Sequence, residues 1–250
     1  HARPSRTGRS RNPLMPGSDR MIDSHIHGIE PVPGNYVDHK ELTMMVSCVA
    51  KADEWDAQIA IDDSRVIKSY GVHPWYVEQW TLENKKRLFD MMQADPDIHV
   101  GEIGLDSKRG QILGQTMVFI QQLDIAEYFN RVVTIHDVGC EKMVLDAIKG
   151  RKFKGVILHS YGSDSYVKPY TEIGCYFSIS PRSLSRSDIR VKRLMDAIPD
   201  DRLLLESDSP SCGKGFNGMG DFADRLGSIV GRPSEELMSL AEDNLKRLFS

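Results

Sequence analysis

The stretch V-G-E-I-G-L-D at residues 100–106 is an apolar run that carries a carboxylate, Glu102, in its interior. Burying such a charge is costly unless it is paired or binds a metal ion. Seven further short apolar runs lie between turn signals. Most are continuous rather than alternating, as in parallel strands that are covered by helices. The expected strands are 21–24, 42–49, 66–72, 98–103, 132–135, 155–158, 175–179 and 203–206.

Stretches with helical periodicity separate these runs. Apolar residues recur there at spacings of three and four, which places them on one face of a helix. The expected helices are 82–93, 112–129, 141–149, 188–198 and 234–249. This alternation predicts an α/β fold, a single-domain (β/α)8 TIM barrel over residues 21–250. An open doubly wound sheet is the competing fold, but it would normally carry a glycine-rich phosphate loop after its first strand, and the sequence has none there.

The composition is that of a globular protein. Of 250 residues, 40% are hydrophobic and 27% are charged. No run approaches the roughly 18 consecutive apolar residues that cross a membrane, so we expect no membrane-spanning segment. Four cysteines lie far apart, at positions 48, 140, 175 and 212, which favours reduced thiols and a cytoplasmic location. Nothing in the sequence predicts a stable protein partner.

Charge is spread unevenly along the chain. Residues 1–20 contain five arginines and one acid, Asp19, so this segment carries +4 and the rest carries −8, for a net charge of −4. The segment is rich in Arg, Ser, Pro and Gly, and we expect a disordered tail or a cloning remnant ahead of Met21. The acidic remainder excludes a bulk basic surface that would attract nucleic acid. A phosphate-bearing substrate would need another source of positive charge, such as bound metal ions.

Metal-binding residue types stand at the ends of five expected strands. His25 and His27 alternate at the end of the first strand and therefore point to the same face. The candidate ligands are His25, His27, Glu102, His136, His159 and Asp208. Any one of them could be an ordinary polar residue at a strand end, but active sites of such barrels draw residues from the carboxyl ends of several strands. Six ligands exceed the three of a usual catalytic zinc site. We therefore expect two divalent ions about 3.5–4 Å apart, with Glu102 as the bridge.

Other side chains near these strand ends are candidates for substrate binding. His73 stands in G-V-H-P at 71–74, where it could bind or protonate a substrate or serve as a structural histidine. The aromatic residues at 75, 76 and 80 could stack on bases or pack loops. Ser160 and Tyr161 follow the sixth strand and offer hydroxyl and backbone N–H groups to a phosphate, with an ordinary loop as the alternative.

Taken in order, these pieces resemble the TatD-type metal-dependent deoxyribonucleases of the amidohydrolase superfamily. The matching motifs are D-S-H-I-H at 23–27, G-V-H-P at 71–74, G-E-I-G-L-D at 101–106, I-H at 135–136, L-H-S-Y-G at 158–162, L-L-L-E-S-D-S-P at 203–210 and N-L-K-R-L-F at 244–249. The resemblance spans residues 21–250. It implies a barrel phosphodiesterase that acts on DNA, as a 3′–5′ exonuclease, with two divalent ions such as Mg, Zn, Mn, Ni or Fe.

The resemblance also implies a role for each ligand. One ion would be held by His25, His27, Glu102 and Asp208. The second would be held by Glu102, His136 and His159. Glu102 and Asp208 would be the catalytic residues, since Glu102 bridges the ions and Asp208 orients or deprotonates the attacking water. His73 would contact the phosphate.

The sequence departs from this family around the substrate. The family usually has an Arg two residues after the fifth-strand histidine, where this chain has Val138, next to Asp137. The segment after D-S-P is shorter than usual, and Lys214 is the one cation in residues 211–222, which makes it a further candidate for substrate binding. The departures leave the metal ligands intact and alter the surroundings of the substrate.

Two alternatives to a deoxyribonuclease stay open. One is another amidohydrolase-superfamily hydrolase with a lactone, amide or phosphoester substrate. Many such enzymes bridge two metals with a carboxylated lysine on strand four, and residues 98–105 contain no Lys. PHP-type phosphoesterases need later histidines, and none follows His159. The other alternative is a metal-binding scaffold with little turnover, against which stands the cost of keeping unused buried carboxylates.

Overall fold

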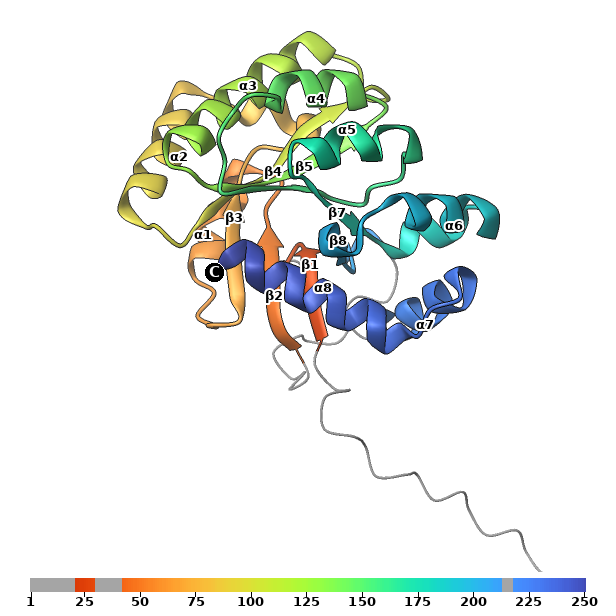
Figure 1. Ribbon diagram of the computed structural model, residues 1–250. Helices are drawn as coiled ribbons and strands as arrows, with labels where there is room; N and C mark the ends of the chain where they lie inside the picture. The colour runs from red at the N-terminus through yellow and green to blue at the C-terminus, as the bar shows by residue number, and fades with distance from the viewer. Residues whose placement is uncertain (1–20, 30–41, 213–217) are drawn as a thin grey trace, which may run out of the picture.

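Eight parallel strands form a barrel in the computed structural model, which describes residues 21–29, 42–212 and 218–250 (Figure 1). The strands are β1 Met21–Ile26, β2 Leu42–Cys48, β3 Val66–Tyr70, β4 His99–Asp106, β5 Val132–Val138, β6 Gly155–Leu158, β7 Tyr176–Ile179 and β8 Leu203–Leu205. Each strand pairs in parallel with the next one along the chain, from β1 to β8. The predicted (β/α)8 barrel is confirmed.

The segment after β8 brings the two ends of the sheet together. The backbone N–H of Asp208 donates to the carbonyl of His25 at 3.1 Å, and that of His27 donates to Ser209 at 2.9 Å. Asp23 accepts a further hydrogen bond from the backbone of Ser207 at 2.9 Å. These contacts place the end of β8 against the end of β1.

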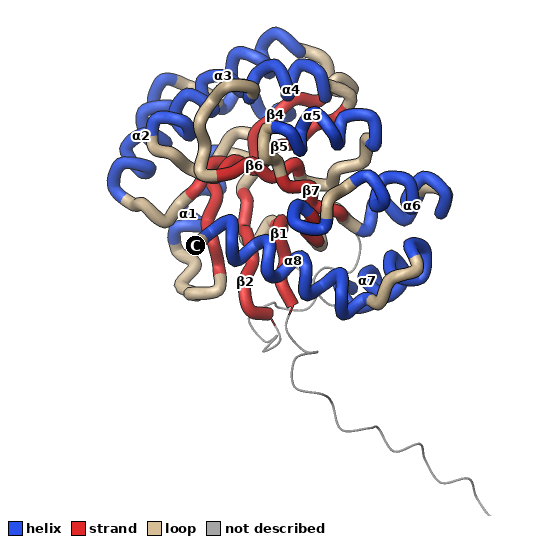
Figure 2. Tube along the Cα trace, in the orientation of Figure 1, coloured by secondary structure: helices blue, strands red, loops and turns tan. Residues whose placement is uncertain are grey.

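Helices surround the sheet, as the colouring of Figure 2 shows. They are α1 Trp55–Ile59, α2 Leu82–Ala94, α3 Ile112–Tyr128, α4 Glu141–Ile148, α5 Val167–Glu172, α6 Asp188–Ala197, α7 Met219–Val230 and α8 Ser234–Phe249. The five expected helices are present, with ends that differ from the predicted ones by at most one residue. The sequence did not predict α1, α5 and α7. The first two have five and six residues, too few to show a helical period.

The strands are buried on both sides because the core lies inside the barrel and also between the barrel and its helices. All eight residues of β4 are buried, which explains why the expected strands are continuous apolar runs. Trp55 and Phe119 are among the largest fully buried side chains, and both come from the surrounding helices. Each such side chain contributes roughly 2–3 kcal/mol of burial free energy.

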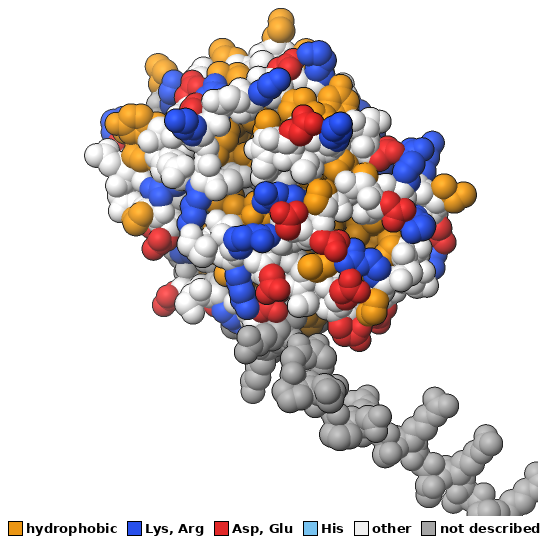
Figure 3. Space-filling model, viewed as in Figure 1, with side chains coloured by type: hydrophobic (Ala, Val, Ile, Leu, Met, Phe, Trp, Pro, Cys, Tyr) orange, Lys and Arg blue, Asp and Glu red, His pale blue; other side chains and the backbone are white. Residues whose placement is uncertain are grey.

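Several predictions concern composition and location rather than fold. No helix among the described residues is long and apolar enough to cross a membrane. All four cysteines are free, and Cys48, Cys140 and Cys175 are buried. The face drawn in Figure 3 mixes Lys and Arg with Asp and Glu side chains. The expected tail at 1–20 and Lys214 lie outside the described residues, and the cytoplasmic location stays a prediction.

Candidate metal centre

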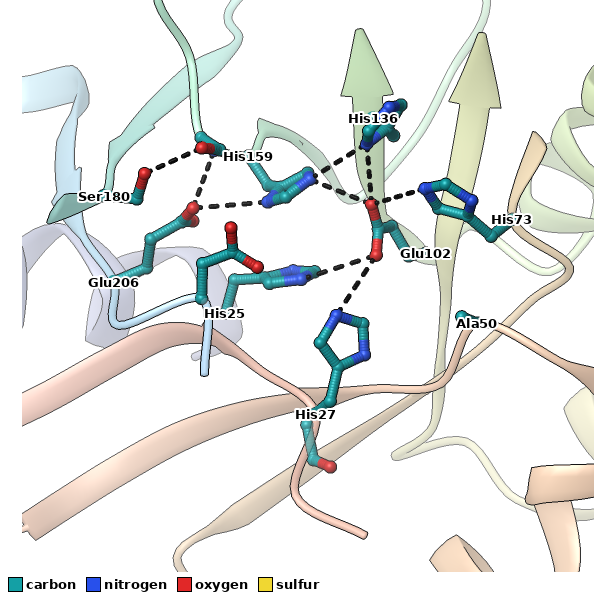
Figure 4. A network of polar contacts seen from close by, with 12 residues as sticks. His25, His27, Ala50, His73, Glu102, His136, His159, Ser180 and Glu206 are labelled. Carbon is teal, nitrogen blue, oxygen red and sulfur yellow. Dashed lines mark hydrogen bonds and ion pairs between the residues drawn. The ribbon is translucent and has the colours of Figure 1, made fainter. Parts of the chain in front are cut away.

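The six expected ligands come together in one cluster. His25, Glu102 and His136 lie within β1, β4 and β5, His27 and His159 directly follow β1 and β6, and Asp208 lies three residues after β8. Three groups of side chains can each bring their ligand atoms within 4.8 Å of one another. The first group is His25, His27 and Glu102, the second is His25, His159 and Asp208, and the third is His73, Glu102 and His136. Glu102 and His25 each belong to two groups. The groups therefore form one continuous cluster, seen from close by in Figure 4.

Irregular strand pairing aims the key side chains into this cluster. Between Val100 and Ile103, β4 advances three residues while β5 advances two, and β1 has a similar irregularity between Asp23 and Ile26. Such bulges re-aim side chains and are common next to active sites. Glycine at position 104 lets β4 approach β5 closely, because a Cβ there would lie 1.9 Å from the backbone oxygen of His136. Its φ of +148° also disfavours other residues.

The two carboxylate oxygens of Glu102 face different sets of histidines (Figure 4). Oε2 lies 3.6 Å from Nε2 of His25 and 3.6 Å from Nε2 of His27. Oε1 lies 3.0 Å from Nδ1 of His136 and 2.9 Å from Nε2 of His159. The carboxylate is almost wholly buried and stands between His25 and His27 at the end of β1 on one side and His136 of β5 and His159 after β6 on the other. This is the position that a bridging ligand requires.

Two of the histidines contact a further carboxylate through their second ring nitrogen. Nε2 of His136 lies 3.3 Å from Asp106 Oδ2, and Nδ1 of His159 lies 3.2 Å from Glu206 Oε1. Metal-ligating histidines usually donate their second ring N–H to such a carboxylate, which sets the ring orientation. Asp106 and Glu206 were not among the predicted site residues. Both could have been found by the criterion used for Glu102, since they also end apolar strands.

His73 faces the cluster as a hydrogen-bond donor. Its Nδ1 accepts a hydrogen bond from the backbone N–H of Trp75 at 3.1 Å. The proton of the neutral ring is therefore on Nε2, which lies 3.2 Å from Glu102 Oε1. A protonated nitrogen cannot bind a metal ion, so this tautomer favours His73 as a donor to a bound group over His73 as a ligand.

The charged groups of the cluster shift one another's pKa. Burial raises the pKa of Glu102, but His159 and His73 outweigh burial and hold it well below its usual range. Burial and His25 lower the pKa of His159, yet Glu102 and Glu206 raise it overall to about 10. Burial and His25 hold the pKa of His27 below its usual value. Protons on the raised imidazoles compete with metal ions, so metal binding must release them.

The donor atoms of the cluster fit the binding of divalent metal. Atoms that share one ion at about 2.1 Å lie roughly 3 to 3.6 Å apart at ordinary coordination angles, and the distances around both Glu102 oxygens fall close to this range. Both ring nitrogens of His25 are buried and have no hydrogen-bond partner. Buried polar atoms are nearly always paired. Imidazole and carboxylate groups together suit Zn, Mn, Fe, Ni and related ions.

The model of the family described as "TatD related DNase" matches residues 22–250. The chain belongs to this family. It is 26% identical to tatdn3 of Danio rerio over 230 residues, which cover 82% of this chain and 85% of that protein. It is 29% identical over 146 residues to "3'-5' ssDNA/RNA exonuclease TatD" of Klebsiella pneumoniae, a match that covers 56% of each chain. The predicted family and the predicted metal-dependent hydrolase activity are confirmed.

Solved structures show the same fold. The TatD homologue YjjV of Escherichia coli superposes with a TM-score of 0.80 over 92% of this chain and 97% of that one, at 19% identity. An uncharacterised amidohydrolase of Saccharomyces cerevisiae superposes with a TM-score of 0.76 over 92% of this chain and 99% of that one, at 13% identity. The barrel fold of this chain is therefore shared with proteins that are less than 20% identical to it in sequence.

The two expected substrate contacts after β6 differ in their neighbours in this TatD-related barrel. The Ser160 hydroxyl lies 2.7 Å from that of Ser180, in the loop after β7. Tyr161 is only 4% exposed and its ring packs against Tyr170 and Phe177. Its phenol is therefore part of the core, and its role as a substrate contact stays a prediction. Asp137 accepts a hydrogen bond from Tyr170 at 2.8 Å.

Arg182 is a residue near the cluster that the sequence analysis missed. It lies in the short 3-10 helix Pro181–Ser185, directly after β7. Its Nη2 is 3.5 Å from Asp208 Oδ2. The same oxygen accepts a weak hydrogen bond from the thiol of Cys212 at 3.1 Å. Its position three residues after a buried strand could have identified it, but only His, Glu and Asp residues at strand ends were predicted as candidate ligands.

Proposed function

We propose that this chain is a two-metal phosphodiesterase, a deoxyribonuclease that removes nucleotides from the 3′ end of DNA. One observation carries the proposal: the two oxygens of the buried Glu102 carboxylate face two separate sets of imidazole nitrogens. A pair of ions bridged by one carboxylate is the arrangement with which many phosphodiesterases clamp the attacking and leaving oxygens of an in-line displacement.

The cluster divides naturally between two ions. His25, His27, Glu102 and Asp208 would hold the first, since their ligand atoms belong to two overlapping groups. Glu102, His136 and His159 would hold the second, since the two imidazole nitrogens lie within 3.0 Å of Glu102 Oε1. Two bound divalent ions would lower the pKa of a water molecule and offset the charge of a phosphoryl oxygen.

The chain's own groups complete the chemistry. Asp208 would take the proton of the attacking water, since its nearly buried carboxylate stands beside His25 and His159. His73 would donate its Nε2 proton to a phosphate oxygen, because its Nδ1 is held as an acceptor by the backbone of Trp75. Asp106 and Glu206 would keep the rings of His136 and His159 in their orientations.

Nucleic acid is the substrate class that the relatives favour. The relative in Klebsiella pneumoniae is named as an exonuclease acting on single-stranded DNA and RNA. Trp75 is 42% exposed and its indole N–H donates to Asp106 at 2.7 Å, so the ring stands at the edge of the cluster, with the Arg109 guanidinium over the ring. Exposed aromatic rings bind bases by stacking.

Metal analysis and a nuclease assay test the proposal together. The purified protein should bind two divalent ions per chain. It should release mononucleotides from a 5′-labelled single-stranded oligonucleotide, lose this activity in chelator and recover it when Mn²⁺ or Mg²⁺ is returned. An oligonucleotide blocked at its 3′ end should resist cleavage. Two bound ions with hydrolysis of lactones or amides but not of DNA would favour another amidohydrolase activity. Bound ions without any hydrolysis would favour a scaffold.

A further inference from the structure

We propose that Arg182 is the cationic contact for the substrate phosphate at this centre, and that it stands beside Asp208 until metal ions take that carboxylate. The inference rests on the proposed phosphodiesterase function and adds a specificity-determining residue to it.

The backbone that carries Arg182 is held firmly at the edge of the cluster. The 3-10 helix Pro181–Ser185 is separated from the end of β7 by one residue, Ser180. The Ser180 hydroxyl bonds that of Ser160 at 2.7 Å, and the Ser183 backbone donates to the Ser180 carbonyl at 3.0 Å. The Ser185 hydroxyl closes the turn on the Arg182 carbonyl at 2.8 Å. A fixed backbone with a long side chain lets the guanidinium reach the cluster without a loop movement.

The side chain of Arg182 lies between the cluster and solvent. It is 61% exposed, whereas the Asp208 side chain that it approaches is 4% exposed. The separation of 3.5 Å is at the limit of a hydrogen bond. A contact this long between an exposed and a buried group holds the guanidinium weakly.

Metal binding would change the partner of Arg182. Asp208 is expected to become a ligand, and the positive charge of the ions then satisfies its carboxylate. Within residues 21–29, 42–212 and 218–250, Arg182 makes no ion pair with another carboxylate. Its guanidinium would therefore be left beside the ions with its hydrogen-bond donors free. A planar guanidinium can donate two parallel hydrogen bonds to phosphate oxygens, which is the interaction that a phosphodiester needs.

Other cations near the cluster have different partners. The Arg109 guanidinium lies over the Trp75 ring, 3.7 Å from its centroid. Arg186 hydrogen-bonds the carbonyl of Gly162. Among the residues described, Arg182 is thus the one Lys or Arg that contacts an expected metal ligand.

Binding of inorganic phosphate to the Mn²⁺-loaded full-length chain tests the inference without turnover. Isothermal calorimetry should show that Arg182→Ala weakens phosphate affinity about tenfold, the loss of one charge-assisted interaction. Arg182→Lys keeps the charge but not the fork, so it should weaken affinity about threefold. The matched control is Arg190→Ala, which removes the same charge from an exposed position on α6 and should leave phosphate affinity unchanged.

The affinity for Mn²⁺ separates this role from a structural one. Arg182→Ala should bind Mn²⁺ as tightly as the wild type or severalfold more tightly, because a competing positive charge has gone. With single-stranded DNA, KM should rise about tenfold while kcat changes less than threefold, as expected for an interaction made equally in the ground and transition states. Unchanged phosphate affinity in Arg182→Ala, or Mn²⁺ affinity reduced tenfold, would overturn the inference and make Arg182 a support of Asp208.

The same measurements distinguish the two proposals. If the wild type cleaves DNA and Arg182→Ala binds phosphate normally, only the Arg182 inference fails. If the wild type binds phosphate through Arg182 but cleaves no phosphodiester, the proposed function fails and the contact stands.

Discussion

Replacing Glu102 by Gln tests the centre of this site most directly. The substitution keeps the shape of the side chain, removes one negative charge and turns one oxygen into an N–H₂ group. That carboxylate lies within 3.6 Å of five imidazole nitrogens, from His25, His27, His73, His136 and His159. An amide nitrogen cannot ligate a metal ion in place of an oxygen, so the proposed bridge between two ions would be lost.

The size of the effect on stability follows from the contacts of Glu102 Oε1. A protonated imidazole about 3 Å away is attracted by roughly 5 kcal/mol at an effective dielectric constant near 20. Desolvation consumes part of this, and removal of one partner from a buried pair typically costs about 3–5 kcal/mol. We therefore expect metal-free Glu102→Gln to lose about 3–5 kcal/mol of unfolding free energy at pH 6.

This loss should shrink as pH rises. Burial and His25 lower the pKa of His159, but Glu102 and Glu206 raise it overall to about 10, from an ordinary value of 6.5. A raised pKa of the folded state stabilises the protein fully below the ordinary value, and the contribution disappears as pH rises through the folded value. The difference between wild type and Glu102→Gln should thus be large at pH 6 and smaller at pH 10.

Urea denaturation in chelator across this pH range measures the stability, and elemental analysis measures the metal content. Glu102→Gln should bind fewer than two ions per chain and at least a hundredfold more weakly, a loss of about 3 kcal/mol. Glu206→Gln is the matched control, since it contacts only one expected ligand, His159, at 3.2 Å. It should keep both ions with affinity reduced about tenfold. Two tightly bound ions and wild-type stability in Glu102→Gln would refute the reasoning.

Three further variants probe other parts of the structure. Asp208→Asn should reduce DNA hydrolysis at least a hundredfold and leave metal binding partly intact, and unchanged turnover would remove Asp208 from the role of base. Asp106→Asn should weaken metal binding about tenfold by releasing His136, and an unaltered affinity would show that this contact does not orient the ring. His99 is buried at the start of β4, and burial and then Lys154 lower its pKa to about 3. Its contribution to unfolding free energy is complete above pH 6.5 and is lost as pH falls toward 3, by about 1.4 kcal/mol per pH unit at most. His99→Asn should remove this slope from denaturation curves, and an unchanged slope would assign it to another group.

The continuous apolar runs and the helical periodicity of the sequence were sufficient to predict the fold and most element bounds. Continuous apolar runs indicated strands covered on both faces, and α3 and α8 were expected from their periodicity within one residue of each end. The candidate ligands were expected from the same pattern, because parallel strands of a barrel bring their carboxyl ends to one edge. A His, Glu or Asp at the end of a buried strand is therefore placed near the others whatever the loops do.

Short segments gave no such signal. Helix α5 has six residues, fewer than two turns, so its apolar residues cannot show a period. Tyr161 follows a strand like Ser160 does, yet it turns into the core against Phe177. The direction of a side chain in a loop depends on local backbone angles that residue type does not reveal.

Tertiary structure alone decided which atoms of the site contact one another. The division of the Glu102 oxygens between two sets of histidines depends on the bulges in β1 and β4. The tautomer of His73 depends on one backbone N–H, and the approach of Arg182 to Asp208 joins residues 26 positions apart through the path of the loop after β7. Sequence determined which chemical groups reach the carboxyl end of the barrel, because the strands run parallel and therefore all end at the same edge. Structure determined which atom of each group faces which partner. The choice of partner depends on differences of a few tenths of an ångström in the distances between atoms of chain segments that meet only in the fold.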